Sequence, residues 1–335
     1  MITDFIQKMI ERADLTEAEA RQAMEEIMSG QSTDAQIAGF LTALRMKGET
    51  SQELVGFAGV MRERAEPLWD GEVLPVLDTA GTGGVRLGTF NISTAAAFVA
   101  AAAGVRVAKH GNRSATSRCG SADVMEALGL DIQMPVERLR RAIKDTRIGF
   151  LFAQRFHTSM KHVMAARMQL KVRTVFNILG PLANPAGARF QVVGVSAPEI
   201  MELMANALNG LNTDHAFVVH GANGMDEVSI SSRTHVVEMR RGEMRQFVIS
   251  PEDFGMTSAR IETILGGDAL ENARIIESVF GGEPGPRRDV VLLNSAPAIV
   301  AGGAAKTWKE GLQLAAEAID SGAALRKLKE LREFN

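Results

Sequence analysis

The feature that most constrains the fold is an alternation of short β-rich runs with helix-length segments after residue 73. The runs lie at residues 76–78, 105–107, 148–152, 190–195 and 215–219. Such alternation predicts a largely parallel sheet with helices on its faces. Two more β-rich runs, at 236–239 and 245–249, flank Arg241-Gly242-Glu243 and predict an antiparallel hairpin added to the sheet.

The first seventy residues carry helical signals instead. Three capping boxes each precede apolar residues at helical spacing: Thr16-x-x-Glu19, Thr33-x-x-Gln36 and Thr50-x-x-Glu53. The predicted fold class is therefore α/β, with a small helical amino-terminal domain and a larger domain whose central, mostly parallel sheet is flanked by helices. We predict the helical domain over residues 1–72 and the α/β domain over residues 73–335.

Composition narrows the functional classes. The chain has 37 Lys+Arg and 40 Asp+Glu, a net charge of −3, whereas a nucleic-acid binder calls for a basic excess. The single cysteine, Cys119, excludes an internal disulfide and fits a reducing compartment. The first residues resemble neither a signal peptide nor a transit peptide, and no apolar run approaches the roughly 18 residues of a membrane span. We expect a cytoplasmic protein without membrane or nucleic-acid partners.

A glycine-rich turn is the strongest local feature. Gly81-Thr-Gly-Gly84 follows the β-rich run that ends at Asp78, and Asn91-Ile-Ser-Thr94 then opens a helix. A strand, a glycine turn and a helix start together form an anion site, because glycines admit close approach and the first helical amides point at the charge. By itself the segment is equally compatible with an ordinary capped βα turn.

A second polar segment, residues 109–121, follows the next β-rich run. It holds three cations and four hydroxyl groups, which suit a phosphorylated ligand. In a doubly wound sheet ligands bind beyond the carboxyl ends of the strands, so both loops should face one rim. The alternative is a solvated polar loop that only caps the following helix.

Asp226 and Glu227 form an acidic pair just past another β-rich run. With a hydroxyl such as that of Ser93, they are hard oxygen ligands suited to Mg²⁺ shared with substrate phosphates, although adjacent acids are usually surface residues. No Cys/His cluster supports zinc. Arg167 has the planar fork that binds a carboxylate in a bidentate way. Its spacing from His157 and Lys161 alone favours a basic surface helix.

Seven ordered segments, taken together, resemble the anthranilate phosphoribosyltransferase family, the second enzyme of the tryptophan branch, over almost the whole chain. They are Gln36-Ile-Ala-Gly-Phe-Leu41, Gly81-Thr-Gly-Gly84, Thr89-Phe-Asn-Ile-Ser-Thr94, Lys109-His-Gly-Asn-Arg-Ser114, Gly120-Ser-Ala-Asp-Val124, Arg173-Thr-Val-Phe-Asn-Ile-Leu-Gly-Pro-Leu-Ala-Asn-Pro185 and Met225-Asp-Glu-Val-Ser229. The resemblance implies a Mg²⁺-dependent homodimer with an active site between its two domains. It also implies that helices from about 160–187 join the helical domain.

The resemblance further implies the site residues. Those that would hold 5-phosphoribosyl 1-diphosphate (PRPP) are Gly81, Gly84, Val85, Thr89, Asn91, Ile92, Ser93, Thr94, Lys109, His110, Gly111, Asn112, Arg113, Ser114, Ala115, Thr116, Ser117 and Cys119. Ser93, Asp226 and Glu227 would bind Mg²⁺ and, with Lys109, carry catalysis. Gly81, Asn112 and Arg167 would contact anthranilate, and His110 and His157 would line its route.

Two departures from the family pattern stand out. Val85-Arg86 replaces an Asp-Gly pair whose acid contacts the donor, and Thr158 replaces a proline. Two other functions remain open from the sequence. A pyrimidine nucleoside phosphorylase shares the architecture, but its first loop reads Lys-His-Ser-Thr-Gly-Gly. A non-catalytic nucleic-acid-binding paralogue would lack the Lys109–Ser114 motif and need a basic surface.

Overall fold

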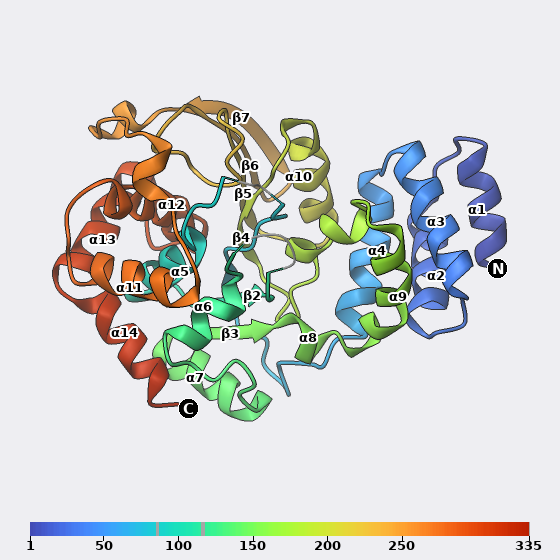
Figure 1. Ribbon diagram of the computed structural model, residues 1–335, viewed down its shortest axis with the longest axis horizontal. Helices are drawn as coiled ribbons and strands as arrows, with labels where there is room; N and C mark the ends of the chain where they lie inside the picture. Colours follow the sequence, from blue (N-terminus) through green and yellow to red (C-terminus); the bar gives the residue numbers. More distant parts are fainter. Residues whose placement is uncertain (85–86, 115–117, 335) are drawn as a thin grey trace.

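The protein is described by a computed structural model that covers residues 1–84, 87–114 and 118–334 (Figure 1). Its amino-terminal part is a helical bundle, and the capping boxes predicted from the sequence are confirmed. Thr16, Thr33 and Thr50 each accept a hydrogen bond from the backbone N–H three residues later. The bundle consists of α1 (Ile2–Ile10), α2 (Glu17–Met28), α3 (Asp34–Lys47), α4 (Ser51–Glu63) and α9 (Lys161–Leu170).

The remainder is built on one mixed sheet, in the order β3-β2-β1-β4-β5-β6-β7. The strands are β1 (Leu77–Asp78), β2 (Val107–Gly111), β3 (Ile148–Phe152), β4 (Phe190–Gly194), β5 (His215–Gly221), β6 (Thr234–Arg240) and β7 (Glu243–Ile249). The first five are parallel, and β6 and β7 add the predicted antiparallel hairpin. The predicted fold class is confirmed.

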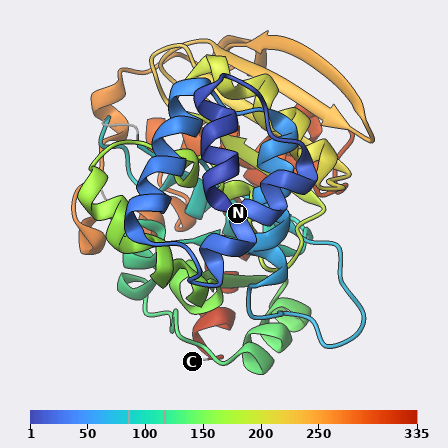
Figure 2. The same cartoon turned by 90° about the vertical axis from the view of Figure 1, so that its right-hand side faces the viewer.

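Helices cover both faces of this sheet. The bundle and α10 (Met201–Gly210) lie against one face, as the view from the bundle side shows (Figure 2). The other face is covered by α5 (Ile92–Ala102), α6 (Ser121–Ala127), α7 (Val136–Thr146), α11 (Ala269–Phe280), α12 (Pro286–Ala301), α13 (Trp308–Asp320) and α14 (Ala323–Arg332). The short helix α8 (Ala153–Phe156) leads from β3 toward α9. Short 3₁₀ helices include η1 (Thr158–Met160), η2 (Val175–Asn177) and η3 (Gly180–Leu182).

Side chains alternate across the sheet, and this alternation separates two hydrophobic clusters. On β5, Ala216 and Val218 pack with the bundle, whereas Phe217 and Val219 pack with the helices of the opposite face. The bundle therefore shares its core with one face of the sheet instead of enclosing a core of its own. The division at residues 72 and 73 stays a prediction.

Strand β2 is longer than the sequence indicated. We expected it to end at Val107, with Lys109 in a loop, but it runs to Gly111. The reason is its partner, because β3 continues the parallel ladder from Val107 opposite Ile148 to Gly111 opposite Phe152. Lys109 and His110 are therefore held by a strand within the sheet. None of the helices in the described residues combines the length and the hydropathy of a membrane-spanning helix.

Candidate active site

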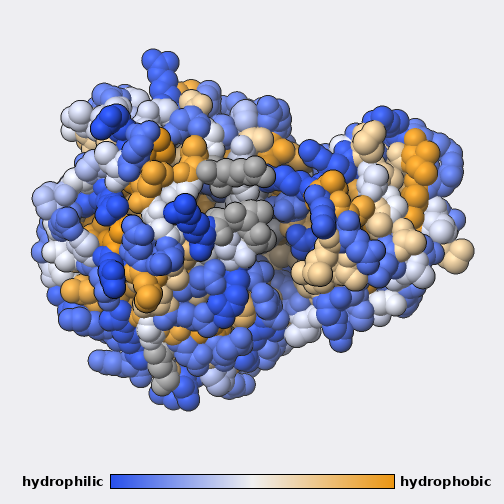
Figure 3. Space-filling model, in the orientation of Figure 1, coloured by the Kyte–Doolittle hydropathy of each residue, from blue (hydrophilic) through white to orange (hydrophobic). Residues whose placement is uncertain are grey.

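A cavity of about 870 Å³ opens at the carboxyl ends of the parallel strands. It lies beside the indentation between the larger body and the helical bundle (Figure 3). Both polar loops line it, so the expectation that they face one rim is confirmed. The predicted site residues that line it are Gly81, Gly84, Asn91, Ser93, Lys109, His110, Gly111, Asn112, Arg113, Ser114, Cys119, Arg167, Asp226 and Glu227.

The glycine turn packs directly on the end of β4. Thr82 N donates to the Gly194 carbonyl at 2.8 Å. A Cβ added at Gly81 would lie 3.0 Å from that same carbonyl oxygen and 3.4 Å from Asp226 Oδ2, so a larger residue would press on the acidic pair. Gly84 adopts φ 84°, a left-handed conformation that favours glycine. The turn thus stands next to the acids and leaves its backbone open to the cavity.

Helix α5 begins at the same place. Asn91 is its N-cap residue and Ser93 lies in its first turn, where backbone N–H groups have no partner within the helix. Thr79 Oγ1 donates to the Ser93 carbonyl at 3.0 Å and so ties the end of β1 to this turn. The predicted arrangement of strand, glycine turn and helix start is therefore present, and anion binding there stays a prediction.

Lys109 is the central cation of the cavity. Its side chain is 2% exposed, and Nζ donates to Thr79 O at 2.8 Å and lies 3.5 Å from Ser93 Oγ. Burial lowers the pKa of Lys109 to about 8, although the nearby Asp78 and Glu227 oppose that shift. Asp78 is itself buried and held by His110 N at 3.1 Å. The ammonium group is therefore fixed between the glycine turn and α5.

Asp226 and Glu227 turn into this cavity from the segment after β5. Burial raises the pKa of both carboxyls, and the mutual repulsion of the pair adds to it for Glu227. Glu227 Oε2 is buried without a hydrogen-bond partner in the described residues. No described group of three or more His, Cys, Asp or Glu is arranged to hold a metal. Two carboxyls and the Ser93 hydroxyl instead suit an ion that keeps water or substrate oxygens as further ligands.

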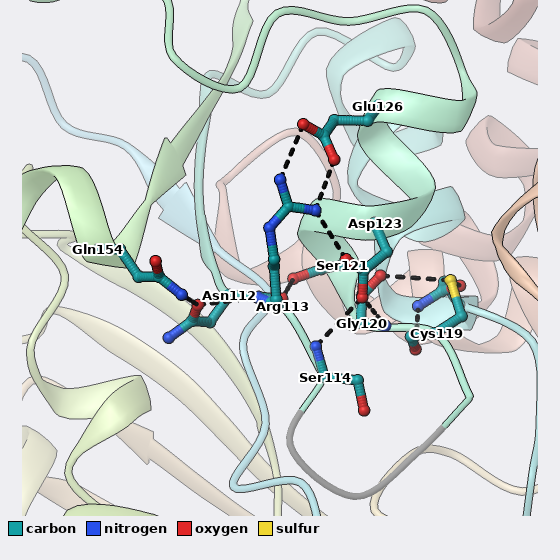
Figure 4. A network of polar contacts seen from close by, with 10 residues as sticks. Asn112, Arg113, Ser114, Cys119, Gly120, Ser121, Asp123, Glu126 and Gln154 are labelled. Atoms are coloured by element: carbon teal, nitrogen blue, oxygen red, sulfur yellow. Dashed lines mark hydrogen bonds and ion pairs between the residues drawn. The ribbon is translucent and has the colours of Figure 1, made fainter. Parts of the chain in front are cut away.

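The loop after β2 is organised by an acidic residue of α6. Asp123 accepts hydrogen bonds from Ser114 N at 3.2 Å and from Gly120 N at 2.8 Å, which pins both ends of the loop. Arg113 extends over α6 to Asp123 and Glu126 (Figure 4). The guanidinium group of Arg113 is thus already paired with two carboxylates. The predicted contact of Arg113 with the donor would therefore involve the other atoms of this residue.

Cys119 is part of a second network at the start of α5. Its Sγ donates to Asn91 Oδ1 at 3.3 Å, and the same oxygen accepts from Asn272 Nδ2 at 2.9 Å. Burial raises the pKa of Cys119 to about 11, so it is a neutral thiol at physiological pH. Cys119 and Asn272 together orient Asn91. Asn272 could not be predicted as a partner of Asn91, because it lies on α11, far along the chain.

Arg167 reaches the cavity from α9. Its guanidinium group lies over the Phe176 ring, 5.3 Å from the ring centre, and burial lowers its pKa. No carboxylate of the described residues forms an ion pair with it, so its charge and hydrogen-bond donors remain available to a ligand. Arg167 is half-buried and lines the cavity, a position that favours ligand binding more than spacing alone indicated, and its role stays a prediction.

Two buried histidines pack against each other next to the cavity. His110 and His157 are 6% and 5% exposed, and their ring centres are 5.2 Å apart. Burial lowers their pKa values to about 4 and about 3, so both rings are neutral at physiological pH. Only His110 lines the cavity itself.

Four other predicted site residues do not line the cavity. Ile92 and Thr94 are fully buried on the inner side of α5, and Thr89 forms an isolated bridge with Leu265. His157 lies behind His110. Val85, Ala115, Thr116 and Ser117, also predicted in the site, fall outside the described residues, as does Arg86.

Sequence reasoning missed the cations that follow Arg167. Lys171 and Arg173 both line the cavity. Arg173 Nη2 lies 3.1 Å from Ser196 Oγ and 3.4 Å from the Gly83 carbonyl, so it fastens the glycine turn to the segment after α9. The available signal for Arg173 was its position as the first residue of a segment that carries the family resemblance. Its side-chain chemistry alone did not indicate a role.

Comparison with known proteins agrees with this geometry. Residues 3–65 match the family described as glycosyl transferase family, helical bundle domain, and residues 74–325 match its a/b domain. An anthranilate phosphoribosyltransferase of Symbiobacterium thermophilum is 54% identical over 98% of this chain and 96% of its own length. One from Geobacter sulfurreducens is 50% identical over 99% and 98%.

Solved structures give the same result. The crystal structure of anthranilate phosphoribosyltransferase from Thermus thermophilus is 44% identical, with a TM-score of 0.92 over 98% of both chains. The Saccharomyces cerevisiae enzyme in complex with PRPP and Mg is 28% identical, with a TM-score of 0.89 over 99% of this chain and 97% of that one. Fold, cavity and sequence identity together show that the chain belongs to the anthranilate phosphoribosyltransferases of the glycosyl transferase family.

Proposed function

We propose that the cavity binds PRPP beside anthranilate and transfers the phosphoribosyl group to the anthranilate amine. The bond between C1 and the diphosphate oxygen breaks, a C1–N bond forms, pyrophosphate leaves and the amine proton passes to solvent. The observation that carries the proposal is the convergence on one cavity of the glycine turn, Lys109, two carboxyls and Arg167. An aryl amine is nucleophilic when neutral, so no residue is assigned as a general base.

The donor is assigned to the side of the cavity formed by the glycine turn and α5. Negative charge builds on the diphosphate as the C1–O bond breaks. Gly81–Gly84, the residues Asn91 and Ser93 at the start of α5, and Lys109 all line that region. Because Lys109 is already fixed by Thr79, it needs little rearrangement, and catalysis then rests mainly on positioning.

Magnesium is assigned to Ser93, Asp226 and Glu227. The buried, unpartnered Glu227 Oε2 supports the fit, because a cation would supply the partner that this oxygen lacks. The solved structure of the Saccharomyces cerevisiae relative with PRPP and Mg supports the choice of ion. When bound, Mg²⁺ supplies neutralising charge for the departing diphosphate. The raised pKa values of both carboxyls imply that the protein's affinity for the ion falls as the solution is acidified.

Anthranilate is assigned to the α9 side. Arg167 would bind its carboxylate, while Phe176 beneath the guanidinium and the neutral His110 ring leave a weakly polar wall for the aromatic ring. A complex of the Saccharomyces cerevisiae enzyme with 4-fluoroanthranilate supports this acceptor. The second step of tryptophan biosynthesis follows as the pathway role.

We also propose that the chain is a homodimer. Ile10 of α1 and Met46 of α3 are 62% and 65% exposed, which leaves apolar surface on the bundle for a second copy to cover. Light scattering on the purified protein would measure the mass directly, and a mass of one chain would contradict the proposal. The cytoplasmic location remains a prediction.

The test of function is the fluorescence of anthranilate itself. When the protein is mixed with PRPP, Mg²⁺ and anthranilate, the anthranilate fluorescence should decrease. The amount of pyrophosphate released should equal the amount of anthranilate consumed. Omitting PRPP gives the control. Unchanged fluorescence with an intact, folded protein would refute the proposed function.

A further inference from the structure

Helix α9 ends on a lysine in an unfavourable backbone conformation. Lys171, its C-cap residue, has φ 51° and ψ 27°, the left-handed region in which a Cβ crowds the following carbonyl. Glycine or asparagine is the usual residue at such a position. The backbone needs only the N–H of Lys171, which donates to the Arg167 carbonyl at 3.2 Å. A strained residue of this kind points to a role for its side chain.

Lys171 differs from the other described non-glycine residues with positive φ, which are Arg12, Arg147, Asn212 and Arg241. The Arg12 and Arg147 side chains donate to backbone carbonyls, Asn212 belongs to a residue type that tolerates this region, and Arg241 makes the tight turn between β6 and β7. Of these five, Lys171 alone lines the cavity.

The other cations among the described lining residues are already engaged or assigned. Lys109 donates to Thr79, Arg113 is paired with Asp123 and Glu126, and Arg173 is bound to Ser196 and the Gly83 carbonyl. Arg167 is assigned to the acceptor. The Lys171 side chain makes no hydrogen bond or ion pair with any described residue, and it is exposed. Its ammonium group is therefore available to an anionic ligand.

The position of its neighbour indicates which anion. Arg173, two residues later, touches the glycine turn so closely that a Cβ at Gly84 would lie 2.5 Å from its Nη1. The segment after α9 therefore runs along the diphosphate side of the cavity. That side also carries Asp226 and Glu227, whose negative charge opposes a diphosphate unless cations balance it.

We propose that Lys171 contacts the diphosphate of the donor and that its left-handed conformation is retained for this contact at the expense of stability. This inference rests on the proposed function. Lys171 would be a binding residue that comes from the bundle side, whereas Lys109 and the glycine turn belong to the sheet. The donor would then be gripped from both sides of the cavity.

The test compares Lys171→Gly with Arg147→Gly, a control at the left-handed C-cap of α7, away from the cavity. Lys171→Gly should raise Tm by about 2 °C, because the strain is relieved. Its KM for PRPP should rise about five- to tenfold, with kcat and the KM for anthranilate within about twofold of native, because one exposed charge-assisted contact is lost. Lys171→Arg should restore most of the PRPP affinity, and Arg147→Gly should leave it unchanged.

Two outcomes would overturn the inference. An unchanged KM for PRPP in Lys171→Gly would show that the lysine touches no donor, and a rise confined to anthranilate would assign it to the acceptor. Binding of inorganic pyrophosphate with Mg²⁺, measured by calorimetry, keeps this test separate from the proposed function. If native protein binds pyrophosphate but turns over no anthranilate, the proposed function fails, while weaker pyrophosphate binding by Lys171→Gly would still support the contact.

Discussion

Arg167→Ala is the substitution that most sharply tests how the acceptor is held. The guanidinium group is supported by the Phe176 ring, is partly withdrawn from solvent and has no carboxylate partner in the described residues. Its substrate contact would therefore be a charge-assisted, bidentate pair, and such hydrogen bonds contribute about 1.5–3 kcal/mol. At about 1.4 kcal/mol per factor of ten, the KM for anthranilate should rise roughly 10- to 100-fold.

The assay is anthranilate fluorescence at saturating PRPP and Mg²⁺. Because Arg167 is assigned to the acceptor alone, the KM for PRPP should stay near the native value. Arg167→Lys should recover only part of the loss, since an ammonium group keeps the charge but not the planar fork. Arg241→Ala, at the tip of the β6–β7 hairpin, is the control. An unchanged KM for anthranilate in Arg167→Ala would show that Arg167 does not bind the carboxylate of the acceptor.

Four further outcomes are expected. Replacing both Asp226 and Glu227 by alanine should abolish Mg²⁺-dependent turnover in the fluorescence assay, and undiminished activity would remove them from the metal site. The kcat/KM for PRPP should fall as pH rises above about 8, because burial lowers the pKa of Lys109 to about 8 and the cation is lost there; a profile that stays flat to pH 10 would contradict its role. By linkage, the same depressed pKa means that the unfolded chain holds more protons above pH 8, so Lys109 makes the free energy of unfolding rise between about pH 8 and 10.5. Glu53 is fully buried, and its carboxylate accepts hydrogen bonds from Leu15 N at 2.9 Å and from Lys47 Nζ at 3.0 Å. Glu53→Ala should therefore lower the free energy of unfolding, measured in urea, by about 3 kcal/mol. The control Glu63→Ala, which removes an exposed ion pair, should lower it by less than about 1 kcal/mol. Equal losses in the two variants would show that burial of the Glu53 carboxylate is unimportant.

Much of the fold was predictable because its signals are local. Capping boxes fix the starts of α2, α3 and α4 through contacts three residues apart, and the alternation of strands and helices specifies the parallel sheet. The end of β2 was not predictable, because its last residues are ordered by pairing with β3. A ladder between segments some forty residues apart leaves no mark on either segment alone.

The site was predictable where one segment supplies several groups, as in Gly81–Gly84 and the Asp226–Glu227 pair. It was not predictable where distant side chains compete for the same atoms. The Arg113 guanidinium is taken by Glu126 and Asp123, and Asn91 is oriented from α11 by Asn272. Burial removes other predicted residues from the cavity. Ile92 and Thr94 share a motif with Ser93, but both are fully buried in the core.

A crystal structure of the protein with PRPP, Mg²⁺ and 4-fluoroanthranilate bound would test the proposed site most directly. We expect the diphosphate at the backbone of Gly81–Gly84, with Lys109 within hydrogen-bond distance and the metal between Ser93 and the two carboxyls. The carboxylate of the acceptor analogue should lie against Arg167. A diphosphate bound outside this cavity, or Asp226 and Glu227 without metal beside an ordered donor, would contradict the proposed donor and metal sites.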